Sequence, residues 1–109
     1  NCYGSMGAEY ISREGCTEKF PTSIIRVPKP HPSTTMHPTQ KPVGLCEWLI
    51  RTFTEQGDIV LDNAMGSGST GVACLKNGRK FIGMELNGGF FEIARNRIEH
   101  TIKGVQDTL

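Results

Sequence analysis

A short apolar segment that runs into a glycine loop is the feature that most restricts how this chain can fold. Residues 58–62 are Asp-Ile-Val-Leu-Asp, and residues 64–68 are Ala-Met-Gly-Ser-Gly. The first pattern is typical of a short buried strand, and the apolar positions from 70 to 75 predict a helix after the glycines. Asn77-Gly78 is a helix-stop signal, and a second buried strand is expected over residues 80–85. This order predicts parallel strands with a right-handed crossover, so the fold class is α/β.

Apolar residues also recur at helical spacing on each side of this unit. One set follows Pro42 in a helix that Gly57 is expected to end, and consists of Leu45, Trp48, Leu49 and Phe53. The other predicts a closing helix and consists of Phe90, Phe91, Ala94, Ile98 and Ile102. The solvent-exposed face of this helix is expected to carry Glu92, Arg95 and Glu99.

The amino-terminal third has a different character. Residues 1–21 are glycine-rich and weakly patterned, and we interpret them as the tail of a preceding region. The β-branched run Ser23-Ile24-Ile25-Arg26-Val27 predicts a strand, and residues 28–42 hold five of the six prolines, which predicts an extended connector. The chain is therefore divided into a tail (1–21), a strand and proline-rich connector (22–42) and an α/β domain (43–109).

Length, charge and cysteine usage limit the class of protein. A chain of 109 residues is one domain or part of one, and a start at Asn1 rather than Met indicates a fragment. No apolar run approaches the roughly 20 residues of a membrane-spanning helix. The four cysteines form no Cys-x-x-Cys pair, so we interpret them as reduced structural thiols of a cytoplasmic protein without a metal site. The net charge of +1, with scattered cations, settles nothing about partners.

The glycine loop and the acids beside it predict a nucleoside-binding site. Ligands of open parallel sheets bind beyond the carboxyl ends of the strands, where Asp62 and Glu85 are expected. Gly66 and Gly68 allow the backbone to bend and to present amide donors at a helix N-terminus. Glu85 follows Gly66 by 19 residues, close to the spacing of about 20 at which an acid binds ribose hydroxyls. Each feature alone also fits a turn or a helix cap, but together they favour the 43–109 domain as a cofactor-binding one.

Two nucleoside cofactors match this loop. Gly66-x-Gly68-x-x-Gly71 follows the dinucleotide fingerprint, so NAD is an alternative. In dinucleotide folds, however, the first glycine follows the strand almost at once, whereas residues 62–65 intervene here. Asp62 at the mouth of the loop would repel a pyrophosphate. An acid there suits the ammonium group of S-adenosylmethionine.

Upstream of this unit, residues 37–42 form the hexamer His-Pro-Thr-Gln-Lys-Pro. Together with Val60-Leu61-Asp62, Gly66-Ser67-Gly68-Ser69-Thr70 and Phe81-Ile82-Gly83-Met84-Glu85, it closely resembles the DNA adenine-N6/cytosine-N4 methyltransferase family. The arrangement is similar to the beta type, in which the cofactor motifs follow the catalytic and target-recognition segments. The resemblance covers residues 22–100 well and residues 1–21 poorly.

The resemblance implies a partial Rossmann-like fold and an enzyme of DNA methylation, as in restriction–modification. By this resemblance the cofactor would be S-adenosyl-L-methionine, and the parent protein would methylate an amino nitrogen of adenine or cytosine in double-stranded DNA. The hexamer would line the methionine end, the loop would hold the amino-acid moiety, and the segment from Glu85 would bind the nucleoside; Gln40 would only fix the loop. The implied cofactor-binding residues are His37, Pro38, Thr39, Lys41, Asp62, Ala64, Met65, Gly66, Ser67, Gly68, Ser69, Thr70, Glu85, Leu86 and Asn87.

The chain departs from the family in three ways. Asn63-Ala64 stands where Pro-Phe is common, which removes one apolar wall, and Gly88-Gly89 loosens the adenine side. The 109 residues also contain no Pro-Pro dipeptide, so the Asp/Asn/Ser-Pro-Pro-aromatic tetrapeptide that orients the flipped base is absent, and no catalytic residue is assigned. In the beta type that tetrapeptide lies upstream.

From these departures we expect a missing N-terminal catalytic half that pairs with an open sheet edge, and no activity from this chain alone. A noncatalytic nucleoside-binding accessory module is the alternative from another functional class, and a homodimer stays open.

Overall fold

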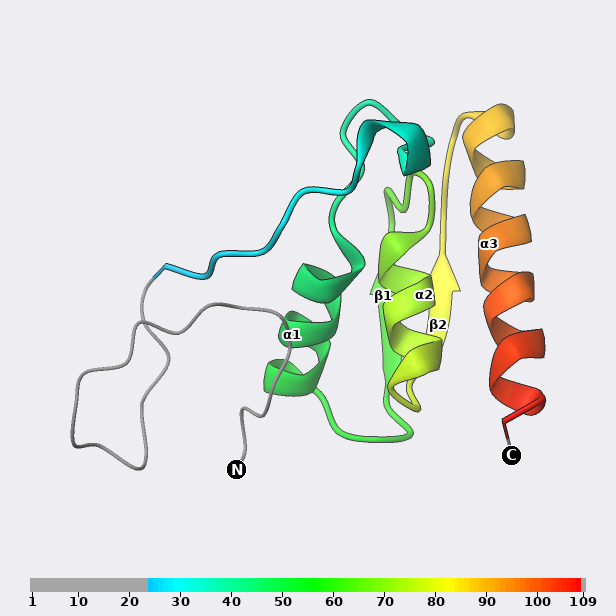
Figure 1. Ribbon diagram of the computed structural model, residues 1–109. Helices are drawn as coiled ribbons and strands as arrows, with labels where there is room; N and C mark the ends of the chain where they lie inside the picture. Colours follow the sequence, from blue (N-terminus) through cyan, green and yellow to red (C-terminus); the bar gives the residue numbers. More distant parts are fainter. Residues whose placement is uncertain (1–23, 109) are drawn as a thin grey trace.

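A computed structural model describes residues 24–108 (Figure 1). A short 3₁₀ turn, η1 (Pro32–Thr34), interrupts an extended connector that leads to helix α1 (Val43–Phe53). Strand β1 (Ile59–Asp62), helix α2 (Ser69–Lys76), strand β2 (Lys80–Gly83) and helix α3 (Gly88–Gln106) follow in that order. The predicted tail over residues 1–21 lies outside the described residues.

The two strands pair in parallel, with Ile59 opposite Lys80 and Asp62 opposite Gly83. Helix α2 makes the crossover between them and packs on both α1 and α3. In Figure 1 it lies over the strands, with α1 on one side and α3 on the other. The predicted α/β class with a parallel βαβ unit is therefore confirmed.

Small side chains fill the core between the helices and the covered face of the sheet. Its centre consists of Cys46, Ile50, Ala73 and Cys74, against which Val43, Val60 and Phe81 pack. Cys46 and Cys74 are free thiols, and burial raises the pKa of both, that of Cys74 to about 11. The expectation of reduced structural thiols is confirmed for these two cysteines, while Cys2 and Cys16 lie outside the described residues.

The other face of the sheet is open to solvent. Strand residues alternate between the two faces, and the uncovered one presents Ile59, Leu61, Ile82 and, just after β2, Met84. Between 51% and 63% of each of these residues is exposed. The prediction of two buried strands was therefore wrong: one face is exposed, and on the other Val60 and Phe81 are only partly buried. An apolar run indicates burial on both faces, but all three helices of the described region pack around the same side.

Two further predictions were wrong. Residues 24–27 form no strand, and Ile24 is 71% exposed. The β-branched run has strand propensity, but propensity depends strongly on context, and within residues 24–108 the sheet consists of β1 and β2. Helix α1 ends at Phe53 rather than at Gly57, because Thr54 leaves the helical conformation and its hydroxyl donates to the carbonyl of Ile50. The other helices follow the predicted pattern, with Asn77 as C-cap of α2.

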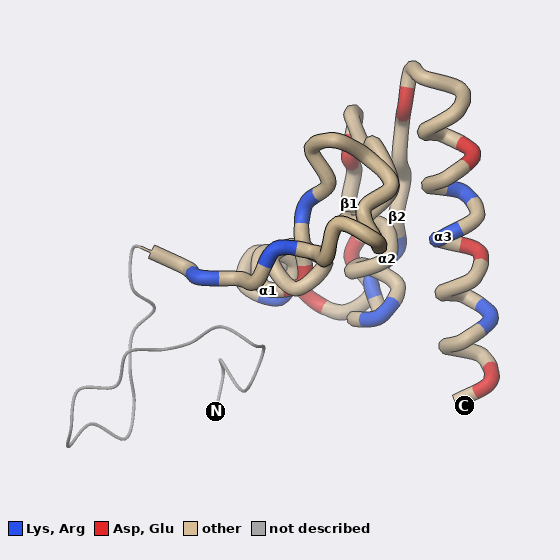
Figure 2. The backbone as a smooth tube through the Cα atoms, turned by 45° about the horizontal axis from the view of Figure 1, so that its top comes forward, with Lys and Arg blue, Asp and Glu red and all other residues tan. Residues whose placement is uncertain are grey.

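Charged residues are interspersed over the described part of the chain, as the sequence predicted. Figure 2 shows acidic and basic positions interspersed along α3, and basic positions spread over the connector and the other elements. No helix within residues 24–108 is both long enough and apolar enough to span a membrane.

Candidate cofactor-binding site

The carboxyl ends of both strands meet the glycine loop at one edge of the sheet. Beyond β1, the loop returns to β2 through the Met65 amide, which donates to the carbonyl of Met84 at 2.9 Å. The Met84 amide in turn donates to the carbonyl of Asp62, also at 2.9 Å. Backbone hydrogen bonds therefore join the two segments that carry the predicted acids.

Glycine is required at both turning points of the loop. Gly66 and Gly68 have φ angles of +55° and +82°, in the left-handed region that side chains disfavour. Gly68 is the N-cap of α2, and a β-carbon there would lie 3.0 Å from the β-carbon of Ala94 on α3. The predicted sharp bend is confirmed, and the loop also lets α3 approach the backbone closely.

Glu85 joins the glycine loop to the start of α3. Its Oε2 accepts from the Gly66 amide at 2.8 Å, and its Oε1 accepts from the Asn87 amide at 2.9 Å. The pKa of this carboxyl lies below its ordinary value, chiefly because of the Asn87 amide and, against the opposing effect of burial, the Gly66 amide. The carboxylate is partly exposed, so it is charged, fixed in direction and able to accept further donors.

Asp62 takes part in a local turn at the end of β1. Its Oδ1 accepts from the Ala64 amide at 3.1 Å, which is an Asx-type turn. Asn87 likewise has a local role, because its side chain accepts from the Phe90 amide and caps α3. These contacts explain why both side chains hold their positions beside the loop, whether or not a ligand binds there.

The hexamer folds back onto the glycine loop. The imidazole of His37 lies against Gly66, where an added β-carbon would be 3.5 Å from ring atom Cδ2. The ring also packs on Phe90 of α3, with the centroids 4.1 Å apart and the planes tilted by 51°. The Thr39 amide donates to Nδ1 of His37 at 3.1 Å and fixes the ring. Residues distant in sequence therefore converge beside Gly66.

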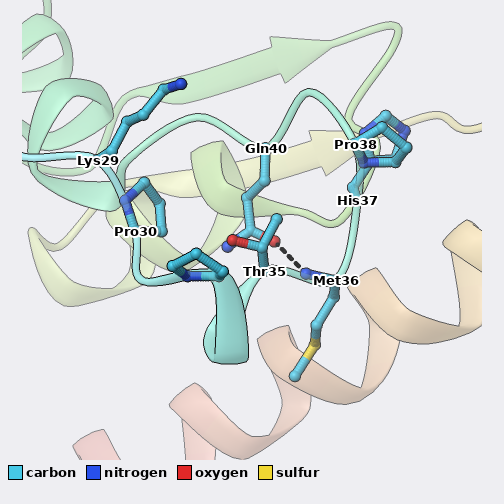
Figure 3. A pocket seen from close by; sticks show the side chains of 8 residues that line it. Lys29, Pro30, Thr35, Met36, His37, Pro38 and Gln40 are labelled. Atoms are coloured by element: carbon cyan, nitrogen blue, oxygen red, sulfur yellow. Dashed lines mark hydrogen bonds between the residues drawn. The ribbon is translucent and has the colours of Figure 1, made fainter.

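Gln40 anchors the hexamer from within, as the sequence predicted. Its Oε1 accepts from the Met36 amide and from the Ser67 hydroxyl, each at 3.0 Å. Figure 3 shows the contact with Met36 at a hollow of about 560 Å³, which is lined by Lys29, Pro30, Pro32, Thr35, Met36, His37, Pro38 and Gln40. The lining includes neither Asp62 nor Glu85, and His37 and Pro38 are the predicted site residues that line this hollow.

The predicted residues fall into two groups. The loop forms a buried floor, whose buried members are Met65, Ser67, Gly68 and Ser69. The exposed members are Pro38, Thr39, Lys41, Ala64, Leu86 and Asn87. Leu86 is fully exposed. The structure therefore brings His37, Gly66 and Glu85 together, and leaves the adenine side of the predicted pocket unenclosed.

Two residues that the sequence reasoning missed support this arrangement. Phe90 packs on His37, and Arg97 donates from α3 to the carbonyl of Ser67 at 2.6 Å. For Arg97 the helical spacing could have indicated this role, because it follows the core residue Ala94 by three positions and so lies on the same, inward face of the helix. A charged residue on that face was overlooked among the apolar ones.

Comparisons with known proteins identify the family. The family model described as DNA methylase, of the N6/N4 type, matches residues 8–96. The chain belongs to the DNA methylase family. It is 48% identical over 63 residues to the type II methyltransferase M2.DpnII of Streptococcus pneumoniae, a match that covers 58% of this chain and 24% of the relative. It is 43% identical over 63 residues to the DNA adenine methyltransferase YhdJ of Escherichia coli, covering 58% and 21%. The chain thus spans about a quarter of these relatives.

Solved structures agree with this assignment. The complex of M1.HpyAVI with S-adenosylmethionine matches with a TM-score of 0.66 and 37% identity, over 84% of this chain and 44% of that one. A DNA modification methylase of Thermus thermophilus, complexed with S-adenosyl-L-methionine, matches with a TM-score of 0.55 and 36% identity, over 58% and 26%. The match confirms a partial Rossmann-like methylase fold. Within the described residues, no cluster of side chains suits a metal ion.

Proposed function

We propose that this chain is the S-adenosylmethionine-binding part of a DNA amino-methyltransferase that modifies adenine-N6 or cytosine-N4. The observation that carries the proposal is the convergence of Glu85, the glycine loop and His37 at the carboxyl end of the sheet. Two relatives of this fold have been solved with the same cofactor. S-adenosylmethionine supplies an electrophilic methyl group, and this chain would hold and orient it.

Each part of the cofactor has a matching group in the site. Glu85 is charged and fixed, and its remaining lone pairs would accept the two ribose hydroxyls. The backbone of Gly66–Gly68 would bind the amino-acid moiety, with Asp62 near the ammonium group. His37 would close the loop side through its packing on Phe90. The remaining residues predicted from the family would line the edges of this pocket.

The test of cofactor choice is a titration calorimetry experiment with S-adenosylhomocysteine, S-adenosylmethionine and NAD. The first two are expected to bind, and NAD is expected to bind at least about tenfold more weakly because of the acid at the loop mouth. Equal or tighter binding of NAD would overturn the assignment in favour of a dinucleotide site.

We further propose that this chain does not transfer a methyl group by itself. The sequence holds no Pro-Pro dipeptide, so the tetrapeptide that orients the target amine must come from a separate segment. The chain spans 24% and 21% of the two methyltransferases named above, which leaves most of such an enzyme outside it. A tritiated-methyl assay on mixed-sequence DNA is expected to give no incorporation with this chain alone.

The open face of the sheet is where we place the missing part. Its apolar side chains are Ile59, Leu61, Ile82 and Met84, and parallel sheets are ordinarily covered on both faces. Adding the segment that precedes this chain in its reading frame should restore both a covered sheet and methyl transfer. Mass spectrometry of the product then identifies the modified base.

The accessory-module alternative predicts a different result. In that case cofactor binding persists, but no segment restores transfer and the reading frame encodes no tetrapeptide. A second copy of this chain is another occupant of the open face, and sedimentation would then show a stable dimer.

A further inference from the structure

Helix α3 carries a cation toward the underside of the glycine loop. The Nη1 of Arg97 donates to the carbonyl of Ser67 at 2.6 Å, and contacts the hydroxyls of Ser67 at 2.9 Å and Ser69 at 3.5 Å. The only ion pair in residues 24–108 joins Arg95 to Glu92, so Arg97 has no acidic partner there. Three neutral oxygens at one nitrogen thus replace the water lost when this partly buried guanidinium packs into the protein.

The Ser67 hydroxyl connects Arg97 to the hexamer. It lies within hydrogen-bond distance of Arg97 and donates to Oε1 of Gln40 at 3.0 Å. The same Oε1 accepts from the Met36 amide (Figure 3). Ser67 is only 3% exposed, so water does not readily compete for these bonds. A continuous series of contacts therefore runs from α3 through the glycine loop to the segment that places His37.

The close approach that makes this possible depends on small residues. Gly68 has no side chain, and Ala94, one turn before Arg97, has no exposed surface. The backbones of the loop and of α3 can therefore come near enough for the guanidinium to reach the Ser67 carbonyl. A loop with two glycines at positive φ has many other conformations when it is not held.

We propose that Arg97 is a positioning residue that clamps the glycine loop to the hexamer and so preforms the methionine end of the cofactor site. This inference rests on the proposed function for its consequence, but the clamp itself is a property of the free protein. Holding the loop in its binding conformation removes an ordering cost that the cofactor would otherwise bear.

The first test measures amide hydrogen exchange in the free protein. Arg97→Met keeps an unbranched apolar stem and removes the guanidinium donors. Exchange is expected to accelerate by about tenfold at the amides of Met36 and Gly68, and to stay unchanged at the Arg79 amide, which bonds to Cys74 across the helix-to-strand turn. Arg95→Met is the matched control, because it removes the same charge from an exposed position on α3.

Arg97→Lys provides a rescue. All three contacts come from one nitrogen, and an ammonium group offers three donors. The lysine variant is therefore expected to restore most of the protection at Met36 and Gly68. Unchanged exchange in Arg97→Met, or equal acceleration at every amide including that of Arg79, would overturn the proposal, since the first denies the clamp and the second makes Arg97 a general stabiliser.

The second test compares two ligands by calorimetry. S-adenosylhomocysteine contains the amino-acid moiety that the loop would hold, whereas adenosine contains only the nucleoside assigned to Glu85. Arg97→Met is expected to weaken S-adenosylhomocysteine by about tenfold and adenosine by less than about threefold. Equal losses for the two ligands would contradict a role at the methionine end. If the unmodified chain binds neither ligand, the proposed function fails, and the exchange experiment still decides whether Arg97 is a clamp.

Discussion

The carboxylate of Glu85 accepts a hydrogen bond from the backbone amide of Gly66 at 2.8 Å, across 19 residues of sequence. This contact joins the two features that the sequence singled out, the acid after β2 and the first glycine after β1. It fixes the direction of the acid without consuming all of its lone pairs. The site is in this sense built before any ligand arrives.

Removing that acid is expected to weaken cofactor binding strongly. Glu85→Ala should lower the affinity for S-adenosylhomocysteine by roughly 10- to 100-fold, because charge-assisted bonds to the ribose are lost. Glu85→Gln should lose less, since its carbonyl oxygen still accepts a hydroxyl proton. Calorimetry on the three proteins, with circular dichroism as the folding control, measures the difference. Unchanged affinity in a folded Glu85→Ala variant would show that the ribose lies elsewhere.

The lowered pKa of Glu85 predicts how the loop responds to acid. A depressed folded-state pKa means that the carboxylate stabilises the fold above its unfolded pKa, near 4.5, and that this contribution is lost as the pH falls through the lower folded value. The Gly66 amide should therefore exchange faster only below about pH 4.5, after correction for intrinsic exchange. In Glu85→Gln this step should vanish. A step that persists in the variant would assign the titration to another group.

Substitutions at two glycines with similar φ angles would distinguish the cost of a left-handed backbone from the cost of a steric clash. Gly57 and Gly68 have φ angles of +89° and +82°, but a β-carbon at Gly57 meets no atom within 4 Å, whereas one at Gly68 lies 3.0 Å from Ala94. Gly57→Ala should cost about 1–2 kcal/mol from the left-handed backbone alone. Gly68→Ala should cost about 2–4 kcal/mol, since the clash adds to the strain. Urea denaturation gives both values, and equal costs would mean that α3 yields without penalty.

The order of the elements was predictable because each signal was local. Apolar spacing and the glycine loop predicted α1, β1, α2, β2 and α3, and the clustering of Asp62, Gly66 and Glu85 followed from the parallel order of the strands. The errors arose where the outcome depends on a neighbour. Residues 24–27 have strand propensity but do not join the described sheet. The apolar strands predicted burial on a face that the described helices leave open.

In the site, too, features set by local sequence were predicted and features that depend on a neighbouring element were not. The role of Gln40 was anticipated from the hexamer, but the contacts of Arg97 and Phe90 depend on the angle at which α3 crosses the loop. No local pattern encodes that angle. The inward position of Arg97 was also not predicted because a charged residue is ordinarily assigned to the solvent-exposed face of a helix.

Neighbouring residues of β1 lie on opposite faces of the sheet and should respond differently to substitution. Val60 packs against the core, whereas the next residue, Leu61, is 60% exposed on the open face. Val60→Ala should lower the stability of this chain by about 1–2 kcal/mol, because core contacts are lost. Leu61→Gln should change it by no more than about 0.5 kcal/mol, because little buried surface is removed.

We expect the opposite ranking of these two variants when association with the proposed missing part is measured. If that part covers the open face, Leu61→Gln places an amide in an apolar interface and should weaken association by at least about tenfold, with a parallel loss of methyl transfer. Val60→Ala should leave association nearly unchanged at temperatures where the chain is folded. Pull-down titrations and the tritiated-methyl assay measure the two effects. Association that tolerates Leu61→Gln as well as it tolerates Val60→Ala would place the missing part on a sheet edge, and the open face would need another occupant.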